Sequence, residues 1–180
     1  TLSQPIATRT SISKAIETIG ERMNKDEDVL FLFLTSHGSA DGVFELNNAP
    51  LQIQSLTPDW LKNQLDSAGI KWRVVVVSSC FSGTFIPLLQ NPQSLIITAS
   101  AANKTSFGCT DDADFTYFGR AFFDEALRQE HSLVNAFETA KMTIAEREKE
   151  EGFAPSQPQI YIGTEMEQAL PMLEEGLFPE

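Results

Sequence analysis

The sequence predicts a single α/β domain built on a mainly parallel sheet. Three apolar runs, at residues 29–35, 72–78 and 94–100, are typical of strands, and segments with helical periodicity separate them. The first run is a continuous apolar stretch, which favours burial on both faces, as in parallel sheets covered by helices. Alternation of such strands with helices predicts a layered α/β sandwich.

Two helices are predicted around the first strand. The first spans residues 11–24, with Ser11 as its N-cap. One face of this helix carries Ile12, Ile16, Ile19 and Met23. The second helix begins with Thr57 as N-cap and Pro58 at the first helical position, and Gly69 ends it.

The remaining elements are shorter or follow the third strand. Residues 42–48 and 50–55 are interpreted as a hairpin after the first strand. Further along the chain we expect a short helix over 85–90, a helix face over 118–127, a longer helix capped by Ser132 and a last short strand over 159–163.

The charge balance excludes one class of partner. The 180 residues include 13 Lys and Arg against 25 Asp and Glu, a formal net charge of −12. Binding of nucleic acid or of an anionic membrane needs clustered cations, so neither is expected. No stretch is long and apolar enough to cross a membrane. Two cysteines do not make a disulfide framework.

His37 and Cys80 each follow a predicted strand directly. The run VLFLFLTSHG ends in His37, and VVVVSSCFSG carries Cys80 at the corresponding place. Sites in open parallel sheets form at the carboxyl ends of the strands. The intervening chain is long enough for a hairpin and a crossover helix. If the two strands are neighbours, the two side chains come within reach of each other.

This pairing suits nucleophilic catalysis. An imidazole near a thiol raises its thiolate character, and His37 could then protonate a leaving amine. The N–H groups of Gly38 and Cys80 are candidates for an oxyanion hole. The small residues Ser82 and Gly83 leave room beside the thiol.

A structural interpretation of each residue competes with the catalytic one. A lone cysteine at a strand end is usually a small buried hydrophobe, and a lone histidine is usually a polar loop residue. The matched positions of His37 and Cys80 favour the catalytic interpretation. His131 lies between two predicted helices and is interpreted as a surface residue, and Cys109 as a structural one.

Around these residues the sequence resembles the legumain family of cysteine peptidases, which have the caspase fold. The resemblance rests on FLFLTSHGSADG around His37, VVVVSSCFSG around Cys80 and ITASAANKTSFGCTDDADFTYFG after the third strand. In that family a strand and a His-Gly pair precede a second strand that ends in the nucleophilic cysteine, followed by Ser-Gly. The likeness extends from about Ile6 to Gly163.

The resemblance implies a caspase-like three-layer α/β/α sandwich that hydrolyses peptide bonds. His37 and Cys80 would form the catalytic dyad, and Gly38 and Cys80 would supply the oxyanion N–H groups. No metal or organic cofactor is implied. The substrate would be a protein or peptide, and the family favours an extracytoplasmic or membrane-associated location.

The sequence departs from the family in two places. Family members that cleave after Asn carry an acidic residue two positions before the cysteine, where this chain has Ser78, so the P1 preference (Asn or Asp in the family) is open. The family's first strand and a pocket arginine would precede residue 1, so we expect an N-terminally incomplete domain over 1–180, whose upstream segment is present in the full protein or is cleaved and stays bound. Arg9 and Arg120 are alternative pocket cations, or else solvated surface residues.

Three other functions stay open at this point. A transamidase or ligase would share the chemistry but resolve the thioester with an amine. A catalytically silent scaffold would keep the fold to bind partners. A flavodoxin-type ligand-binding domain ranks last, because no Gly-rich phosphate loop follows the first strand. Self-cleavage is a further hypothesis, motivated by a chain that begins within a loop-like segment.

Overall fold

The sheet has four strands in the order β1-β2-β3-β4. The computed structural model describes residues 5–47, 49–108 and 115–178. The strands are β1 (Leu30–Thr35), β2 (Arg73–Ser78), β3 (Ser94–Thr98) and β4 (Gln159–Ile162). The first three run parallel and β4 is antiparallel to β3. The predicted mainly parallel sheet is therefore confirmed.

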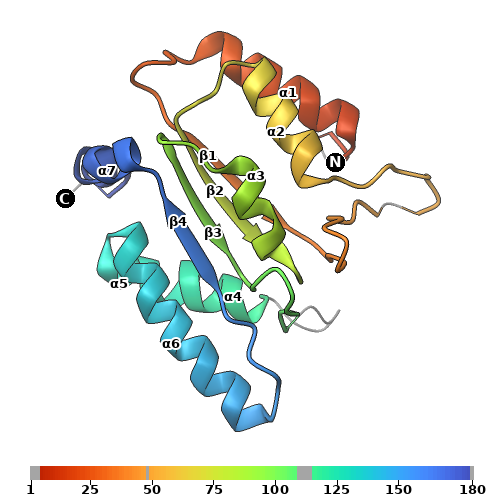
Figure 1. Ribbon diagram of the computed structural model, residues 1–180, viewed down its shortest axis with the longest axis vertical. Helices are drawn as coiled ribbons and strands as arrows, with labels where there is room; N and C mark the ends of the chain where they lie inside the picture. The colour runs from red at the N-terminus through yellow and green to blue at the C-terminus, as the bar shows by residue number, and fades with distance from the viewer. Residues whose placement is uncertain (1–4, 48, 109–114, 179–180) are drawn as a thin grey trace.

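Helices cover both faces of the sheet and make three layers (Figure 1). One face packs on α1 (Arg9–Arg22), α2 (Pro58–Ser67), the 3₁₀ turn η1 (Ser82–Phe85) and α3 (Ile86–Leu89). The other packs on α4 (Tyr117–Gly119), the π-helical η2 (Arg120–Ala126), α5 (Leu127–Glu130), α6 (Leu133–Glu151) and α7 (Thr164–Leu177). The sandwich predicted from the alternating strands and helices is confirmed.

Successive valines of β2 feed the two cores alternately. Val74 and Val76 pack under the α4–α7 layer, whereas Val75 and Val77 pack under α1, α2 and α3. This is the period-2 alternation of a strand with a helix layer on each face. Every residue of β2 and of β3 is buried, as their apolar sequences predict.

The first strand is where the burial prediction was wrong. Residues 30–35 do form a parallel strand, but β1 lies at an edge of the sheet, and Phe31 and Phe33 are 39% and 41% exposed. Among the described residues β1 pairs only with β2. The ring of Phe33 makes an edge-to-face contact with Phe123 of the η2 layer and is otherwise partly open to solvent.

Two local predictions were also wrong. Among the described residues of 42–55 no continuous strand pair forms; isolated antiparallel bridges join Phe44 to Gly38 and to Leu56. The side chains of Phe44 and Leu56 are buried, whereas Leu51 is 55% exposed, so the segment lacks a continuous apolar face to hold two strands. The N-cap of α1 is Thr8 rather than Ser11, which fills the third helical position of a capping box.

The predicted ends of the other helices are confirmed. Thr57 caps α2 with Pro58 in its first turn, and Ser132 caps α6. Gly69, just past α2, has a φ of +71°, a conformation that glycine adopts without steric cost. Helix α7 was not expected; it buries Met166 and Leu170 four residues apart, a spacing that would have revealed it. None of the helices in the described part of the chain has the length and apolarity to cross a membrane.

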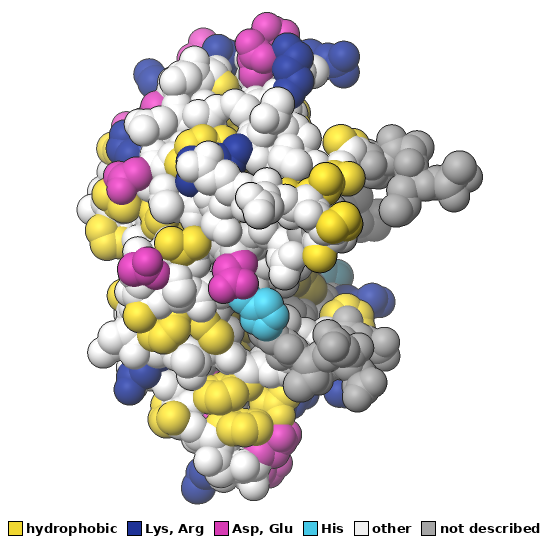
Figure 2. All heavy atoms as spheres, turned by 90° about the vertical axis from the view of Figure 1, so that its right-hand side faces the viewer, with side chains coloured by type: hydrophobic (Ala, Val, Ile, Leu, Met, Phe, Trp, Pro, Cys, Tyr) yellow, Lys and Arg dark blue, Asp and Glu magenta, His cyan; other side chains and the backbone are white. Residues whose placement is uncertain are grey.

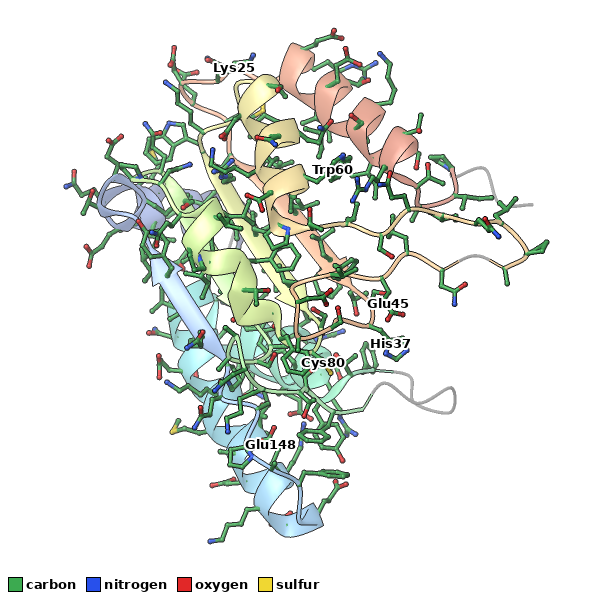
Figure 3. The ribbon with its side chains drawn as sticks, turned by 45° about the vertical axis from the view of Figure 1, so that its right-hand side comes forward. Lys25, His37, Glu45, Trp60, Cys80 and Glu148 are labelled. Atoms are coloured by element: carbon green, nitrogen blue, oxygen red, sulfur yellow. The ribbon has the colours of Figure 1, made fainter. Side chains whose placement is uncertain are left out.

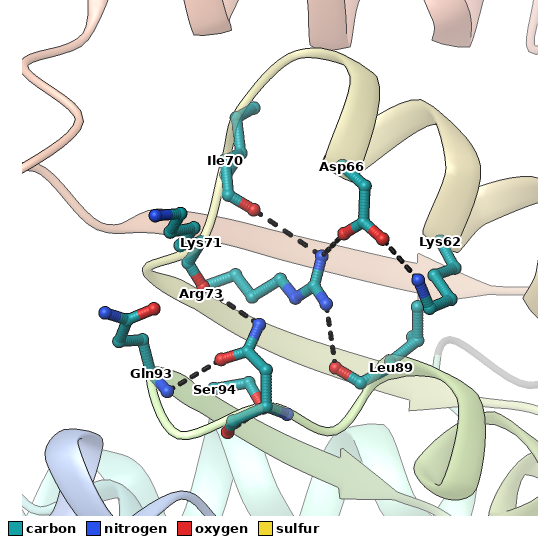
Figure 4. A network of polar contacts seen from close by, with 9 residues as sticks. Lys62, Asp66, Ile70, Lys71, Arg73, Leu89, Gln93 and Ser94 are labelled. Carbon is teal, nitrogen blue, oxygen red and sulfur yellow. Dashed lines mark hydrogen bonds and ion pairs between the residues drawn. The ribbon is translucent and has the colours of Figure 1, made fainter.

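A buried cation joins α2, β2 and α3 at the far end of the sheet from the candidate site (Figure 4). The guanidinium of Arg73, whose side chain is 2% exposed, donates to Asp66 Oδ1 at 3.2 Å and to the carbonyl of Leu89 at 2.9 Å. Burial of Arg73 lowers its pKa, which the charge of Asp66 partly offsets. Partial burial of Asp66 alone would raise its pKa, but the hydrogen bond from Lys62 and the charge of Arg73 outweigh this and hold the pKa below its usual value.

Candidate active site

His37 and Cys80 occupy matching places beyond two adjacent strands. Thr35 of β1 and Ser78 of β2 are register partners at the carboxyl ends of the two strands. His37 and Cys80 each lie two residues further along. Figure 3 shows both at this edge of the sheet. The expectation that neighbouring parallel strands bring these two segments together is confirmed.

The backbones of the two segments are in close contact. A Cβ atom added at Gly38 would lie 2.2 Å from the carbonyl oxygen of Cys80 and 3.0 Å from Ser79 Oγ. Any residue other than glycine would therefore push the histidine segment away from the cysteine turn. Ser79 Oγ is buried and has no hydrogen-bond partner among the described residues.

Residues 43–45 hold the histidine segment from the other side. The N–H of Glu45 donates to the carbonyl of His37 at 2.9 Å, and Ser36 Oγ donates to the carbonyl of Glu45 at 2.7 Å. The side chain of Phe44, the residue before Glu45, is buried in the core under α1, α2 and α3. His37 itself is exposed. Figure 2 looks onto this side of the molecule, whose surface carries hydrophobic, acidic and histidine side chains.

A sharp turn presents Cys80 at the end of β2. Phe81 has a φ of 57°, a left-handed conformation that is uncommon outside glycine and is often found at functional sites. Its N–H donates to the carbonyl of Lys104 at 2.7 Å. Ser82 and Ser100 then lock the turn to the end of β3, because each hydroxyl accepts the other residue's N–H, at 3.2 and 3.0 Å.

Ser106 contacts the Cys80 sulfur and was missed from the sequence. Its N–H donates to Sγ at 3.3 Å, and the thiol lies 3.4 Å from its carbonyl oxygen. Its hydroxyl is 3.8 Å from the sulfur. The loop after β3 was expected to be polar, and its position at the carboxyl end of the strand beside β2 is the signal that could have drawn attention to it.

Two backbone donors flank the thiol. No described residue accepts a hydrogen bond from the N–H of Gly38 or from that of Cys80. Both donors are consequently available to a ligand, which is what the predicted oxyanion hole requires.

The other sequence-predicted residues lie further from the thiol or outside the described part of the chain. Ser78 is 1% exposed and its hydroxyl pairs with Thr116 Oγ1 at 3.0 Å, just ahead of α4. Arg120 is exposed and pairs with Glu125. Arg9 donates to the carbonyl of Ser55 and lies over the ring of Trp60, away from the candidate site in Figure 3.

Two further expectations concern His131 and Cys109. His131 is exposed at the end of α5, as the sequence predicts for a surface residue. Cys109 lies outside the described residues. Within the described ranges, no three His, Cys, Asp or Glu side chains are grouped so as to hold a metal ion.

A groove runs along the outer edge of β1 and ends beside the histidine segment. It has a volume of about 540 Å³ and an apolar lining from α1, β1 and residues 44–46. The whole of β1 and the following Ser36 contribute to it. The expected upstream strand would require such an edge, and it stays a prediction.

The architecture is that of the caspases. A solved structure of caspase-1 from Spodoptera frugiperda superposes with a TM-score of 0.62 at 18% sequence identity, covering 88% of this chain and 69% of that one. At this identity the likeness shows the fold alone. The predicted caspase-like sandwich is therefore confirmed.

Comparison of the sequence identifies the family within this fold. The profile of the Peptidase C13 family matches residues 13–168, so the chain belongs to this family. Legumain from Canavalia ensiformis is 35% identical over 85 residues, which cover 46% of this chain and 18% of that protein. The aligned part thus spans less than a fifth of the relative's length. The resemblance to the legumain family stated from the motifs is confirmed.

Proposed function

We propose that the protein is a cysteine peptidase in which Cys80 is the nucleophile and His37 the general acid and base. The observation that carries this proposal is the direct contact of the His37–Gly38 segment with the Cys80 turn at the carboxyl ends of β1 and β2. The fold and family membership support the same class of chemistry.

The reaction would proceed through a thioester. The thiolate of Cys80 attacks the carbonyl carbon of a peptide bond, and the carbonyl oxygen takes the negative charge. The C–N bond then breaks, with His37 giving a proton to the departing amine. A water molecule, deprotonated by His37, attacks the thioester carbon. The C–S bond then breaks, which releases the carboxylic acid product, whose proton passes to water, and restores the Cys80 thiolate beside protonated His37.

The free backbone donors suit the charged intermediate. The N–H groups of Gly38 and Cys80 have no acceptor among the described residues, so a substrate oxyanion would meet two unpaired donors. Preorganised donors of this kind typically contribute about 2.7–4 kcal/mol each to transition-state stabilisation. Gly38 has two roles: its N–H is one of the donors, and its lack of a Cβ atom permits the close approach of the two segments.

Ser78 and Arg120 are proposed to shape the P1 pocket. Ser78 lies two residues before the nucleophile and is small, neutral and paired with Thr116, which leaves this position without an anionic group. Arg120 begins η2 and lies four residues after Thr116, the partner of Ser78. The hydroxyl of Thr116 accepts the N–H of Gly119, the residue before Arg120. Ser78 supplies no charge and Arg120 is paired with Glu125, so this border favours a neutral P1 side chain, and an acidic one only if it displaces Glu125 from Arg120.

Hydrolysis is preferred over amine transfer on one observation. His37 is exposed, so water reaches the thioester site directly, whereas efficient transfer to an amine needs water to be excluded. A ligase or transamidase would give products extended by the added amine rather than free carboxylates.

A peptide library separates these possibilities. The full-length protein is incubated with the library, and Cys80→Ala is the matched control. Mass spectrometry measures the masses of the products. We expect Cys80-dependent cleavage to free carboxylates. Products that carry the added amine would show a transferase instead. Equal processing by Cys80→Ala would remove Cys80 from the reaction.

A further inference from the structure

Helix α6 carries a buried carboxylate that the proposed mechanism does not use. Glu148 is 3% exposed, whereas Glu146 and Glu150 on the same helix are exposed. Figure 3 shows Glu148 on α6, in a different layer from Cys80. Burial of a carboxylate is unfavourable unless hydrogen bonds compensate for the lost water, so the partners of Glu148 show what it holds.

Both carboxylate oxygens accept from a single backbone donor. The N–H of Ser156 lies 3.1 Å from each oxygen of Glu148. The chain folds back to make this contact just after α6 ends, where the N–H of Phe153 donates to the carbonyl of Glu148 at 2.7 Å. Glu148 forms no ion pair with any residue of the described ranges. Its charge is therefore directed at the Ser156 peptide.

Backbone hydrogen bonds continue from Ser156 to the cysteine turn. The carbonyl of Ser156 accepts from the N–H of Ala101 at 2.9 Å, and the carbonyl of Ala101 accepts from Lys104 at 3.1 Å. The carbonyl of Lys104 accepts from the N–H of Phe81, the residue after the nucleophile, at 2.7 Å. Two residues further on, the N–H of Ser106 points at the Cys80 sulfur.

We propose that Glu148 is a positioning residue that holds residues 101–106 against Cys80. This inference rests on the proposed function only in treating Cys80 as the nucleophile. Both the N–H and the carbonyl oxygen of Ser106 lie within hydrogen-bond distance of the sulfur, so the position of residue 106 sets the polar surroundings of the nucleophile. Glu148 acts through the backbone and does not touch the substrate or the sulfur.

The placement of the carboxylate supports this role over a role in stability alone. An apolar side chain of similar size would fill a buried site without the cost of burying a charge. At position 148 it would also leave the N–H of Ser156 unpaired, and the carbonyl of the same residue is the acceptor for the N–H of Ala101. The neighbouring Ser156 hydroxyl is buried without a partner among the described residues, so the N–H is the group that Glu148 holds.

The test compares Glu148→Ala and Glu148→Gln with two controls. Ser156→Ala alters the same buried place but keeps the N–H, and Glu146→Gln removes a charge from the exposed face of the same helix. Each variant is treated with iodoacetamide at pH 7 and at an alkaline pH at which the thiol is ionised in every variant. The alkylation of Cys80 is followed by mass spectrometry.

We expect Glu148→Ala to lower the alkylation rate at pH 7 by roughly tenfold, which corresponds to about 1.4 kcal/mol. Glu148→Gln keeps one acceptor oxygen and should lose less. Both controls should react like the unaltered protein, and the rates should converge at alkaline pH. Circular dichroism identifies folded variants. If Glu148→Ala does not fold, the alkylation rate of Glu148→Gln decides the test.

Unchanged alkylation at pH 7 in a folded Glu148 variant would overturn the proposal. So would a loss that persists at alkaline pH, because it would reflect blocked access to the sulfur. Alkylation does not need peptide hydrolysis. A protein that cleaves no peptide but shows the Glu148 effect would contradict the proposed function and support the positioning role. A protein that cleaves peptides but shows no Glu148 effect would support the proposed function and contradict the positioning role.

Discussion

The carbonyl oxygen of Cys80 lies 2.2 Å from the point at which a side chain on Gly38 would begin. The histidine segment and the cysteine turn therefore touch through their backbones, and the contact exists only because residue 38 lacks a Cβ atom. Two parallel strands in register bring the segments to this place, and the glycine lets them close the last distance.

Gly38→Ala is expected to lower peptidase activity by about 100-fold, the usual cost of misplacing catalytic groups by about 1 Å. The added methyl group meets a backbone carbonyl, which cannot move without displacing Cys80. Gly176→Ala is the matched control: this glycine lies in α7 with nothing within 4 Å of an added Cβ. It should keep full activity and unfold at a slightly higher temperature. Equal activity of the two variants would show that the contact is unimportant.

Ser100→Ala should destabilise the fold by about 1–3 kcal/mol, because it leaves buried groups unpaired. Ser100 Oγ accepts the N–H of Ser82 at 3.2 Å and donates to the carbonyl of Ser79 at 3.1 Å. Urea unfolding measures the loss. Ser156→Ala, which removes a buried hydroxyl without a partner, should cost less stability. A larger loss in Ser156→Ala would contradict this account of the serine pair.

The Asp66–Arg73 pair gives a pH dependence to stability. Against the effect of partial burial, the hydrogen bond from Lys62 and the charge of Arg73 lower the pKa of Asp66 in the folded state, so these contacts stabilise the protein above the unfolded pKa of about 3.9. This contribution is lost as the pH falls through the folded pKa. Asp66 is 45% exposed, so solvent screening limits the Coulombic part to about 1 kcal/mol or less.

Asp66→Asn is the variant that tests this dependence. The free energy of unfolding in urea should fall relative to the unaltered protein at pH 7, and the difference should shrink in acid, below the folded pKa. Asp59→Asn, also on α2 and exposed, should show no such trend. A difference that is the same at both pH values would show that the charge of Asp66 contributes nothing.

The parallel strands and the place of the site followed from local sequence patterns, whereas the order of the strands came only from the structure. Apolar runs that end in His-Gly and in Ser-Cys predict strands with functional residues at their carboxyl ends, and both segments lie where this pattern requires. The expected upstream strand implied an open edge at β1, but the exposure of Phe31 and Phe33 was not predictable in the same way. The apolar sequence around Phe31 and Phe33 would look the same in an inner strand and in an edge strand. Only the order of the strands in the sheet reveals that these side chains are exposed.

Contacts between distant segments account for most of what was missed. Ser106 reaches Cys80 because Phe81 binds the carbonyl of Lys104, a pairing that no local pattern encodes. Glu148 lies in a run of acidic residues that is typical of a solvated helix face, and its burial depends on how the chain turns back to Ser156. Helix α7 is different, because its apolar spacing was present in the sequence.

The central claim is that His37 activates Cys80, and the most direct test is the rate at which iodoacetamide alkylates Cys80 at pH 7 in the full-length protein. His37→Ala is compared with His131→Ala, which removes the other histidine, exposed at the end of α5. We predict that Cys80 reacts at least tenfold more slowly in His37→Ala and at the unaltered rate in His131→Ala. Equal rates in the two variants would contradict the account, because the thiol would then gain nothing from the histidine beside it.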